Sequence, residues 1–397
     1  MTDFSATKAM FHLPEGMIYL DGNSLGALPK TALARLSETV SAEWGEMLIT
    51  GWNKAGWMAQ PKRVGDRIAS LIGAESGHVT VGDSLSIKVY QALASALDMR
   101  PDRKVILSDS GNFPSDLYMA EGLIAALDRD HELRVVDPEE IENHITDEVA
   151  VTLITEVDYR SGRLHDMARL TAKAHAKGAL TLWDLAHSAG ATQVNLAACG
   201  ADFAVGCTYK YLNGGPGAPG FIYVAPRHAA RARPALSGWL GHDAPFAFEP
   251  SYRPGGGIER MRVGTPPVLA LAALEAALDV WDMTNMADIR ARSVALTSQF
   301  IDEVEAQCPM LTLASPRDAT QRGSQVSFQF DQGYAAMQAL IAHGVVGDFR
   351  APDIMRFGFT PLYIDAGDVS AAVAIMAEVM DKRLWDQAEY KIRAQVT

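Results

Sequence analysis

Short apolar runs alternate with segments of helical period between about Val79 and Val224, and this alternation limits the chain to few folds. Continuous apolar runs of this kind are typical of strands that a sheet buries on both faces. The helical segments between them provide the crossover connections that parallel strands require. The pattern therefore predicts α/β architecture with a mainly parallel sheet. The candidate strands are Val105 to Asp109, Arg134 to Asp137, Val149 to Val157, Ala179 to Leu185, Phe203 to Thr208 and Gly220 to Ala225.

Amphipathic spacing predicts helices between most of these strands, over Ser86 to Leu97, Ser115 to Leu127 and Ala168 to Lys177. Two longer helical segments follow the last strand, from Pro266 to Met283 and from Met286 to Glu305. The first of them opens with two prolines, which suit the start of a helix. We expect this pair of helices to lead out of the large domain.

The rest of the chain is typical of a compact α+β domain. The first 50 residues contain one clear helix, Thr31 to Met47, and we expect them to pack beside the C-terminal part. We therefore expect a large domain over residues 50–284 and a smaller domain formed by residues 1–49 and 285–397. The C-terminal patterns are, in order, a strand at Gln325 to Phe330, a helix at Tyr334 to His343, a strand at Ile354 to Phe359 and a helix at Val369 to Leu384.

The charge balance excludes several classes of partner. The formal net charge is -13, so most of the surface repels nucleic acid and anionic membranes. The chain has 397 residues and 48% hydrophobic content, enough to bury a large core. A small-molecule substrate suits such a protein better than a nucleic acid or a membrane.

Cysteine usage and the lack of apolar spans point to the cytoplasm. The only cysteines are Cys199, Cys207 and Cys308, without CxxC spacing, so neither a disulfide framework nor a zinc knuckle is indicated. No HExxH or similar spacing occurs among the histidines, and we expect no catalytic metal. The N-terminus has no signal-like apolar run, and no stretch reaches the roughly 18 apolar residues of a membrane span. We expect a soluble, unprocessed protein.

The most informative segment is TYKYLNGGPGAPG, Thr208 to Gly220, where Lys210 follows an apolar strand. A lysine amine at a buried strand end can form a Schiff base with an aldehyde cofactor. Lys210 alone is explained more simply as a surface lysine. The part GPGAPG has the letters of a dinucleotide-binding loop, yet it contains two prolines and leads into a strand instead of a helix. We expect no dinucleotide site there.

Two upstream motifs strengthen the interpretation of Lys210. The segment LWDLAHSAG places Asp184 in an apolar strand, where a carboxylate needs a partner. The protonated pyridine nitrogen of pyridoxal 5'-phosphate (PLP) is such a partner, and the alternative is a helix cap. The segment GDSLS lies where a strand ends and a helix begins, so the backbone N–H groups of Leu85 and Ser86 and the Ser86 hydroxyl suit a phosphate. A plain serine cap fits that short segment equally well.

Longer motifs occur in order along nearly the whole chain. They are YLDGNSLGALPK, GWNKAGW, GNFPSD, DLAHSAGA, YKYLNGGPGA, GWLGHDAPF, GTPPVLAL and RFGFTPLY. DLAH and YKYLN in this order are the most specific of them. Together the motifs resemble those of the kynureninases, which are fold-type-I, PLP-dependent transferase-like enzymes.

The resemblance implies the cofactor contacts. Lys210 binds PLP covalently, Asp184 pairs with the pyridine nitrogen, and Phe113 stacks on the ring. His187 packs nearby, and Tyr209 reaches the phosphate or assists protonation. The remaining implied contacts are Leu85, Ser86, Asp116, Thr155, Trp239 and Thr265.

The resemblance also implies a homodimer with the active site at the subunit interface, where Trp239 and Thr265 are shared between subunits. Some relatives carry Asn where this chain has Thr265, which leaves a hydroxyl but no amide. On the substrate side, Arg356 in RFGFTPLY suits an α-carboxylate because its guanidinium binds carboxylates in a bidentate way. The alternative for Arg356 is a surface salt bridge. Ser24 and Trp52 are further candidates, although Trp52 suits a core position nearly as well.

The implied reaction is the PLP-dependent hydrolysis of L-kynurenine to anthranilate and L-alanine, a step of tryptophan catabolism and the kynurenine pathway to NAD. Lys210 is the base, Asp184 sustains the electron sink, and Tyr209 is a candidate proton donor. The motifs do not choose between kynurenine and 3-hydroxykynurenine. One alternative is a class V aminotransferase or a desulfurase, but a desulfurase needs a catalytic cysteine and none follows Cys308. The other alternative is a catalytically silent protein with the PLP-enzyme fold. The joint presence of Lys210, Asp184 and Arg356 disfavours this alternative.

Overall fold

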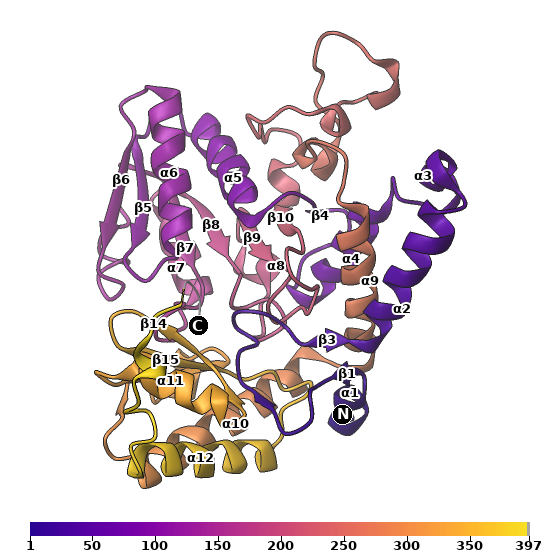
Figure 1. Ribbon diagram of the computed structural model, residues 1–397. Coiled ribbons are helices and arrows are strands. Elements are labelled where there is room, and N and C mark those ends of the chain that lie inside the picture. The colour runs from indigo at the N-terminus through magenta and orange to yellow at the C-terminus, as the bar shows by residue number, and fades with distance from the viewer. Residues whose placement is uncertain (395–397) are drawn as a thin grey trace.

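A seven-stranded sheet forms the centre of the larger part of the computed structural model, which describes residues 1–394 (Figure 1). Only β10 runs against its neighbours, so the expected mainly parallel sheet is confirmed. The expected strand over Val149 to Val157 ends earlier, at Thr155. In spatial order the strands are β4 (Val79–Val81), β10 (Gly220–Val224), β9 (Phe203–Cys207), β8 (Leu180–Asp184), β7 (Val149–Thr155), β5 (Val105–Asp109) and β6 (Glu132–Val136).

Hydrophobic cores lie on both faces of this sheet. Neighbouring residues of β5 alternate between them, with Ile106 in one core and Leu107 in the other. Residues of α5, such as Leu93, pack in the first core, and residues of α7, such as Leu170, pack in the second. Burial on both faces explains why the strands read as continuous apolar runs. The helices of this part are α3 (Gly51–Lys54), α4 (Gln60–Leu71), α5 (Leu85–Met99), α6 (Pro114–Leu127), α7 (Met167–Ala176) and α8 (Leu196–Cys199).

The smaller part contains a four-stranded antiparallel sheet with helices packed against it, as the α+β pattern predicts. Figure 1 shows this part in orange and yellow below the central sheet. Residues 395–397 of the expected small domain lie outside the described residues. The elements are β11 (Thr312–Leu313), β12 (Gln325–Gln329), β15 (Ile354–Gly358), β14 (Asp348–Arg350), α10 (Met286–Gln307), α11 (Gly333–Ala342) and α12 (Ala366–Asp381).

The first residues of the chain join the smaller part. Strand β2 (Ile18–Tyr19) pairs in parallel with β13 (Val345–Val346), and Asp21 forms a bridge with Gly358. Asp21 begins the loop that carries Ser24. The N-terminal segment also holds α1 (Phe4–Ala9) and the short antiparallel pair β1 (Phe11–His12) and β3 (Leu28–Pro29).

The segment Thr31 to Met47, expected to be one helix, is helical as far as Trp44, but the helix type changes at Thr39. Helix α2 spans Lys30–Glu38 and packs against α9 (Val268–Ala277), and a π-helical segment, Thr39–Trp44, follows it. The Thr39 hydroxyl donates to the Arg35 carbonyl at 2.8 Å. Such back-bonding competes with the regular helix ladder, so the change of helix type there has a local cause. The expected helix over Pro266 to Met283 likewise becomes a 3₁₀-helix after Ala277. Within residues 1–394, no helix has the length and apolar character needed to cross a bilayer.

Candidate active site

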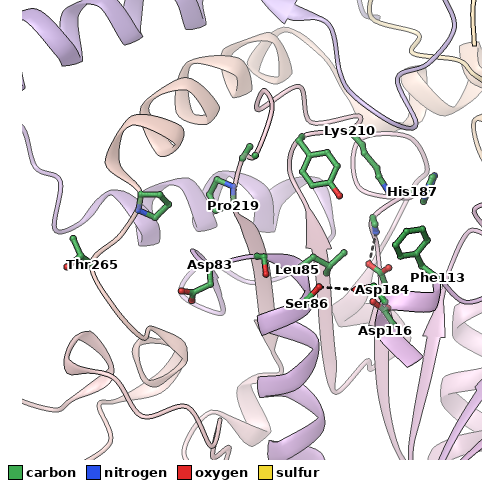
Figure 2. Close-up of a pocket in the computed structure, with 17 residues that line it drawn as sticks. Asp83, Leu85, Ser86, Phe113, Asp116, Asp184, His187, Lys210, Pro219 and Thr265 are labelled. Carbon is green, nitrogen blue, oxygen red and sulfur yellow. Dashed lines mark hydrogen bonds between the residues drawn. The ribbon is translucent and has the colours of Figure 1, made fainter. Parts of the chain in front are cut away.

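A cavity of about 530 Å³ lies beside the carboxyl ends of β8 and β9, and this volume is in the usual range for small-molecule sites, about 300–1,000 Å³. Open α/β sheets bind ligands at this edge. Figure 2 shows Lys210, His187, Phe113 and Asp184 together on one side of the cavity, with Asp83 and Thr265 on the other. The sequence-predicted residues that line it are Leu85, Ser86, Phe113, Asp116, Asp184, His187, Tyr209, Lys210 and Thr265.

Lys210 is half-buried in the turn that follows β9, and its amine faces the cavity. Its Nζ lies 3.0 Å from His187 Nε2 and 5.9 Å from the centre of the Phe113 ring. The turn is pressed tightly against the N-terminal segment, because a Cβ added at Gly26 would lie 2.3 Å from the Lys210 carbonyl oxygen. Only glycine permits this approach, which gives a physical reason for the glycine in the GNSLG motif.

His187 is the hydrogen-bond acceptor for Lys210. The side chain is buried, and burial together with the Lys210 charge lowers the pKa of His187 well below its ordinary value. The imidazole is therefore neutral, and its Nε2 accepts from the lysine ammonium. Its other ring nitrogen, Nδ1, is buried without a partner.

Asp184 and Asp116 form a buried carboxyl pair behind the cavity. Burial raises the pKa of Asp184 to about 6, while the Lys210 charge and the Ala186 N–H, which donates at 2.9 Å, oppose the rise. Burial and the Asp184 charge raise the pKa of Asp116 well above its ordinary value. Two neighbouring buried carboxyls do not both ionise. Asp116 therefore keeps its proton and donates a hydrogen bond to the Asp184 carboxylate.

The first turn of α5 lies between the lysine side of the cavity and Thr265. Ser84 caps the helix by accepting from the Ile87 N–H, and the N–H groups of Leu85 and Ser86 have no acceptor within the helix. The Ser86 hydroxyl lies 3.1 Å from the Ser115 hydroxyl, at the start of α6. Two hydroxyls and free amide donors at a helix N-terminus are suited to an anion such as phosphate.

These residues fit PLP. The cavity presents an amine for the aldehyde, a carboxyl held deep beside it for the pyridine nitrogen, and an aromatic ring at its wall. The anion-binding helix end lies within the same cavity. The unpartnered His187 Nδ1 shows that polar groups around this cavity are not satisfied by the protein alone.

Arg356 and Ser24 lie outside the cavity lining, in a group with Asp348 and Arg350 that we call the arginine cluster. Arg356 and Asp348 are buried, and Ser24 and Arg350 are half-buried. Arg356 Nε donates to Asp348 Oδ1 at 2.6 Å, and its Nη2 donates to Ser24 Oγ at 3.1 Å and to Asp348 Oδ2. Arg356 is only 1% exposed, so the alternative of a surface salt bridge is wrong. The cluster adjoins the cavity through Tyr159, whose carbonyl accepts from Arg356 Nη1.

Tyr159 completes this link, because its ring packs edge-on against Phe113 at 5.2 Å. The charges of Arg356 and Arg350 also reach His187, where they lower its pKa further. Thr155 is buried at the end of β7, in register with Asp184, and its hydroxyl donates to the Val157 carbonyl. Thr155 therefore supports the strand edge and does not line the cavity.

The two predicted tryptophans lie away from the cavity of this chain. Trp52 is on α3 and packs edge-on against Trp57 at 5.8 Å. Trp239 is 38% exposed and packs against Phe246 in a long excursion that stands out from the body of the molecule beyond β10 (Figure 1). Neither residue contributes to the cavity that Lys210 faces.

Sequence reasoning missed several lining residues. Ser115 lies inside the quoted GNFPSD motif, and Asp83 lies inside GDSLS, so both signals were present in the sequence. Their orientation toward the cavity depends on how the strands end side by side. The missed residues are Asp83, Ser84, Ser115, Ala186, Gly217, Ala218, Pro219 and Pro267.

Solved structures with this fold include PLP enzymes. A cysteine desulfurase from Thermococcus onnurineus superposes with a TM-score of 0.80 over 95% of this chain and 98% of that one, at 18% identity. The "C-DES" mutant with glycine covalently linked to its PLP cofactor gives 0.79 over 95% and 100%, also at 18% identity. This likeness establishes the fold-type-I architecture.

Sequence relatives identify the family. The model of the kynureninase C-terminal domain matches residues 289–376. The kynureninase of Pseudomonas fluorescens is 50% identical, and that of Burkholderia pseudomallei is 51% identical; each match covers 98% of this chain and 95% of the relative. The desulfurase and aminotransferase alternatives are not favoured. The chain belongs to the kynureninase family of PLP-dependent enzymes.

Proposed function

We propose that this enzyme hydrolyses L-kynurenine to anthranilate and L-alanine, with the residues of the cavity in the roles below. The observation that supports it best is the convergence of Lys210, Asp184 and the first turn of α5 on one cavity. When bound, PLP supplies an electron sink that stabilises negative charge at the substrate α-carbon.

Lys210 would hold the cofactor aldehyde, and its amine, once released by the substrate amine, would take the α-proton. His187 keeps this amine in place through the 3.0 Å contact with Nζ. Asp184 would face the pyridine nitrogen, because its carboxyl is buried in the cavity wall and is fixed by the Ala186 N–H. Phe113 would cover one face of the ring.

The first turn of α5 would hold the cofactor phosphate. Leu85 and Ser86 offer backbone N–H groups, and Ser86 and Ser115 offer hydroxyls. Tyr209 is proposed as a proton donor for the alanine product. Its neighbour Cys207 and burial raise the pKa of the Tyr209 phenol, so the hydroxyl keeps its proton at neutral pH and has one to give.

Arg356 is proposed as the receptor of the substrate α-carboxylate. Its guanidinium is held by Asp348 and Ser24, so the incoming carboxylate must share donors with Asp348. Arg350 makes this sharing feasible, because its Nη2 lies 2.9 Å from Asp348 Oδ2 and gives that carboxylate a second cation. Ser24 would orient Arg356, and Trp52 is proposed to face the aromatic ring of the substrate.

A homodimer with the active site at the interface is part of this proposal. An apolar groove of about 520 Å³, lined by Trp44, Trp57 and Leu269 among others, shares Pro267 with the active-site cavity. Large apolar side chains are exposed near α3 and on the long excursion, including Ile49 at 77% and Phe248 at 77%. Exposed patches of this kind mark protein interfaces. In the dimer, Trp52 and Trp239 would reach a cavity from across the interface.

We also propose the domain division at residues 50–284, with residues 1–49 and 285–397 forming the small domain. The cytoplasm is the proposed location, because Cys199, Cys207 and Cys308 are all free thiols, which suits a reducing compartment.

The test is to incubate the purified protein with PLP and with kynurenine or 3-hydroxykynurenine and to measure anthranilate, 3-hydroxyanthranilate and alanine. We expect an aromatic product and alanine in equal amounts. Release of sulfur from cysteine, or transamination of alanine, without either aromatic product would contradict the proposal. The comparison of the two substrates also decides which ring is preferred.

A further inference from the structure

Lys88 is a buried cation beside the cavity that the proposed reaction does not use. It lies in the first turns of α5 and is 1% exposed. Its Nζ donates to Asp83 Oδ2 at 2.9 Å, to Gln91 Oε1 at 3.0 Å and to the Met261 carbonyl at 3.1 Å. A lysine ammonium has three donors, so each has an acceptor. Burial of a charge is costly even when the charge is paired, so the presence of a lysine at this buried position needs an explanation.

The first role of Lys88 is its ion pair with Asp83. The Asp83 side chain lines the cavity and is 31% exposed, directly before the first turn of α5. Asp83 has a left-handed φ of 57°, and its carbonyl accepts from the Gly220 N–H at 2.9 Å, which fixes the turn against β10. A carboxylate at this position repels a phosphate group unless a cation neutralises it.

Within residues 1–394, no other cation forms an ion pair with Asp83. Burial and, to a smaller extent, the charge of Arg262 lower the pKa of Lys88, whereas Asp83 raises it. Arg262 is engaged elsewhere, because its Nη1 pairs with Glu259 at 2.7 Å and its Nη2 donates to the Met58 carbonyl. Lys88 is thus the partner that neutralises Asp83.

The second role of Lys88 is its hydrogen bond to the Met261 carbonyl. Gln91 Nε2 donates to the same carbonyl at 3.2 Å, so two α5 side chains hold the end of the 3₁₀-helix Gly257–Met261. The chain continues from Met261 to Thr265, which lines the opposite side of the cavity from Lys210 (Figure 2). Lys88 therefore fixes the distance between the first turn of α5 and the segment that carries Thr265.

We propose that Lys88 is a positioning residue for the cofactor phosphate, which neutralises Asp83 and ties α5 to the Thr265 segment. The proposal rests on the proposed function, which places the phosphate at the first turn of α5. Lys88 acts through Asp83 and Met261, because its three donors point to them and to Gln91.

The test compares the binding of PLP with that of pyridoxal, which lacks the phosphate. The full chain without cofactor is titrated with each aldehyde, and the Kd is read from the absorbance band of the lysine adduct. We expect Lys88→Met to raise the Kd for PLP about tenfold or more and to leave the Kd for pyridoxal within about twofold. Lys177→Met, at an exposed lysine after α7, is the matched control and should change neither value.

A second substitution separates charge from packing. Adding Asp83→Asn to Lys88→Met removes the uncompensated carboxylate and should restore most of the PLP affinity. Asp83→Asn alone leaves Lys88 in place and should tighten PLP binding about threefold, because a net positive charge remains near the phosphate. This single variant keeps the proposal testable even if Lys88→Met does not fold.

Three results would overturn the proposal. One is an unchanged Kd for PLP in Lys88→Met. Another is an equal loss of PLP and pyridoxal binding without recovery on adding Asp83→Asn, which would assign Lys88 to packing alone. The last is weaker PLP binding in Asp83→Asn alone. Failure of the proposed function looks different, because the wild-type chain would then release neither anthranilate nor 3-hydroxyanthranilate, whatever its Kd for PLP.

Discussion

The lysine side of the cavity and the arginine cluster are adjacent regions that treat their charges in opposite ways. Around Lys210, carboxyls are pushed toward the neutral form by burial, and His187 keeps an unpartnered nitrogen. In the arginine cluster, Asp348 is held ionised by Arg356, and the donors of Arg356 are engaged within the protein. The difference shows that the first region leaves polar groups for a ligand to satisfy, while the second satisfies the donors of Arg356 within the protein.

The largest effect is expected for Lys210→Ala. In its proposed roles, Lys210 provides both the covalent attachment of PLP and the base, so kcat should fall by at least about a thousandfold on removal of the amine. The absorbance band of the lysine adduct should also disappear. Steady-state kinetics and a spectrum of the PLP-loaded protein measure both effects. A kcat within tenfold of the wild-type value would contradict the proposed role of Lys210.

Arg356→Lys tests the arginine cluster. Lysine keeps the charge but loses the planar fork, so kcat/KM for kynurenine should fall about a hundredfold, mainly through KM. Arg322→Lys is the matched control, since Arg322 is equally buried in the smaller part but donates to Pro316 and Arg317 carbonyls. An unchanged KM in Arg356→Lys would show that the cluster is structural.

The contributions of buried carboxyls in the two regions to folding stability should depend on pH with opposite signs. Glu156, which follows β7 beside Asp184, has its pKa raised to about 7 by burial, so its stabilising contribution is complete below about pH 4.5 and disappears as pH rises through 7. Asp348 has its pKa lowered because Arg356 pairs with it, an effect that outweighs burial. Its contribution is therefore present above about pH 4 and disappears as pH falls.

Glu156→Gln measures this contrast. Between pH 5 and pH 8, wild type should lose about 2 kcal/mol more unfolding free energy than the variant does, as followed by urea denaturation. Asp348→Asn serves as the opposite case. Its loss of unfolding free energy relative to wild type should become smaller below pH 4, because Asp348 is then protonated in wild type as well. Parallel pH profiles for wild type and Glu156→Gln would refute the assignment of a buried neutral acid.

The smallest effect is expected for Ser24→Ala. Ser24 donates to Asp348 Oδ2 at 2.5 Å and accepts from Arg356 Nη2, so its loss loosens the orientation of Arg356 without removing a charge. The KM for kynurenine should rise about fivefold, near 1 kcal/mol. Ser37→Ala, at an exposed serine of α2, is the control and should leave KM unchanged. A larger effect than that of Arg356→Lys would reverse the assigned importance of the two residues.

The sequence predicted the cofactor side of the site well because its parts lie where strands of the central sheet end. Lys210 follows β9, Asp184 ends β8, and Leu85 begins α5. The parallel arrangement of strands brings such positions to one edge, so strand-end patterns suggested these three positions and the family resemblance supplied the other contacts. The helix expected over Thr31 to Met47 is present as far as Trp44, but amphipathic spacing did not predict its change from α to π type at Thr39.

What the sequence determined by itself is the α/β layering and the identity of the residues that suit PLP, since apolar periodicity and strand-end position are local properties. Tertiary structure alone decided that Asp348 closes on Arg356, that Lys88 neutralises Asp83, and that Gly26 touches the Lys210 turn. These pairings join segments of different elements or depend on how a turn bends. The energies of buried charges depend on which groups folding brings within a few ångströms, and no pattern along the chain records that distance.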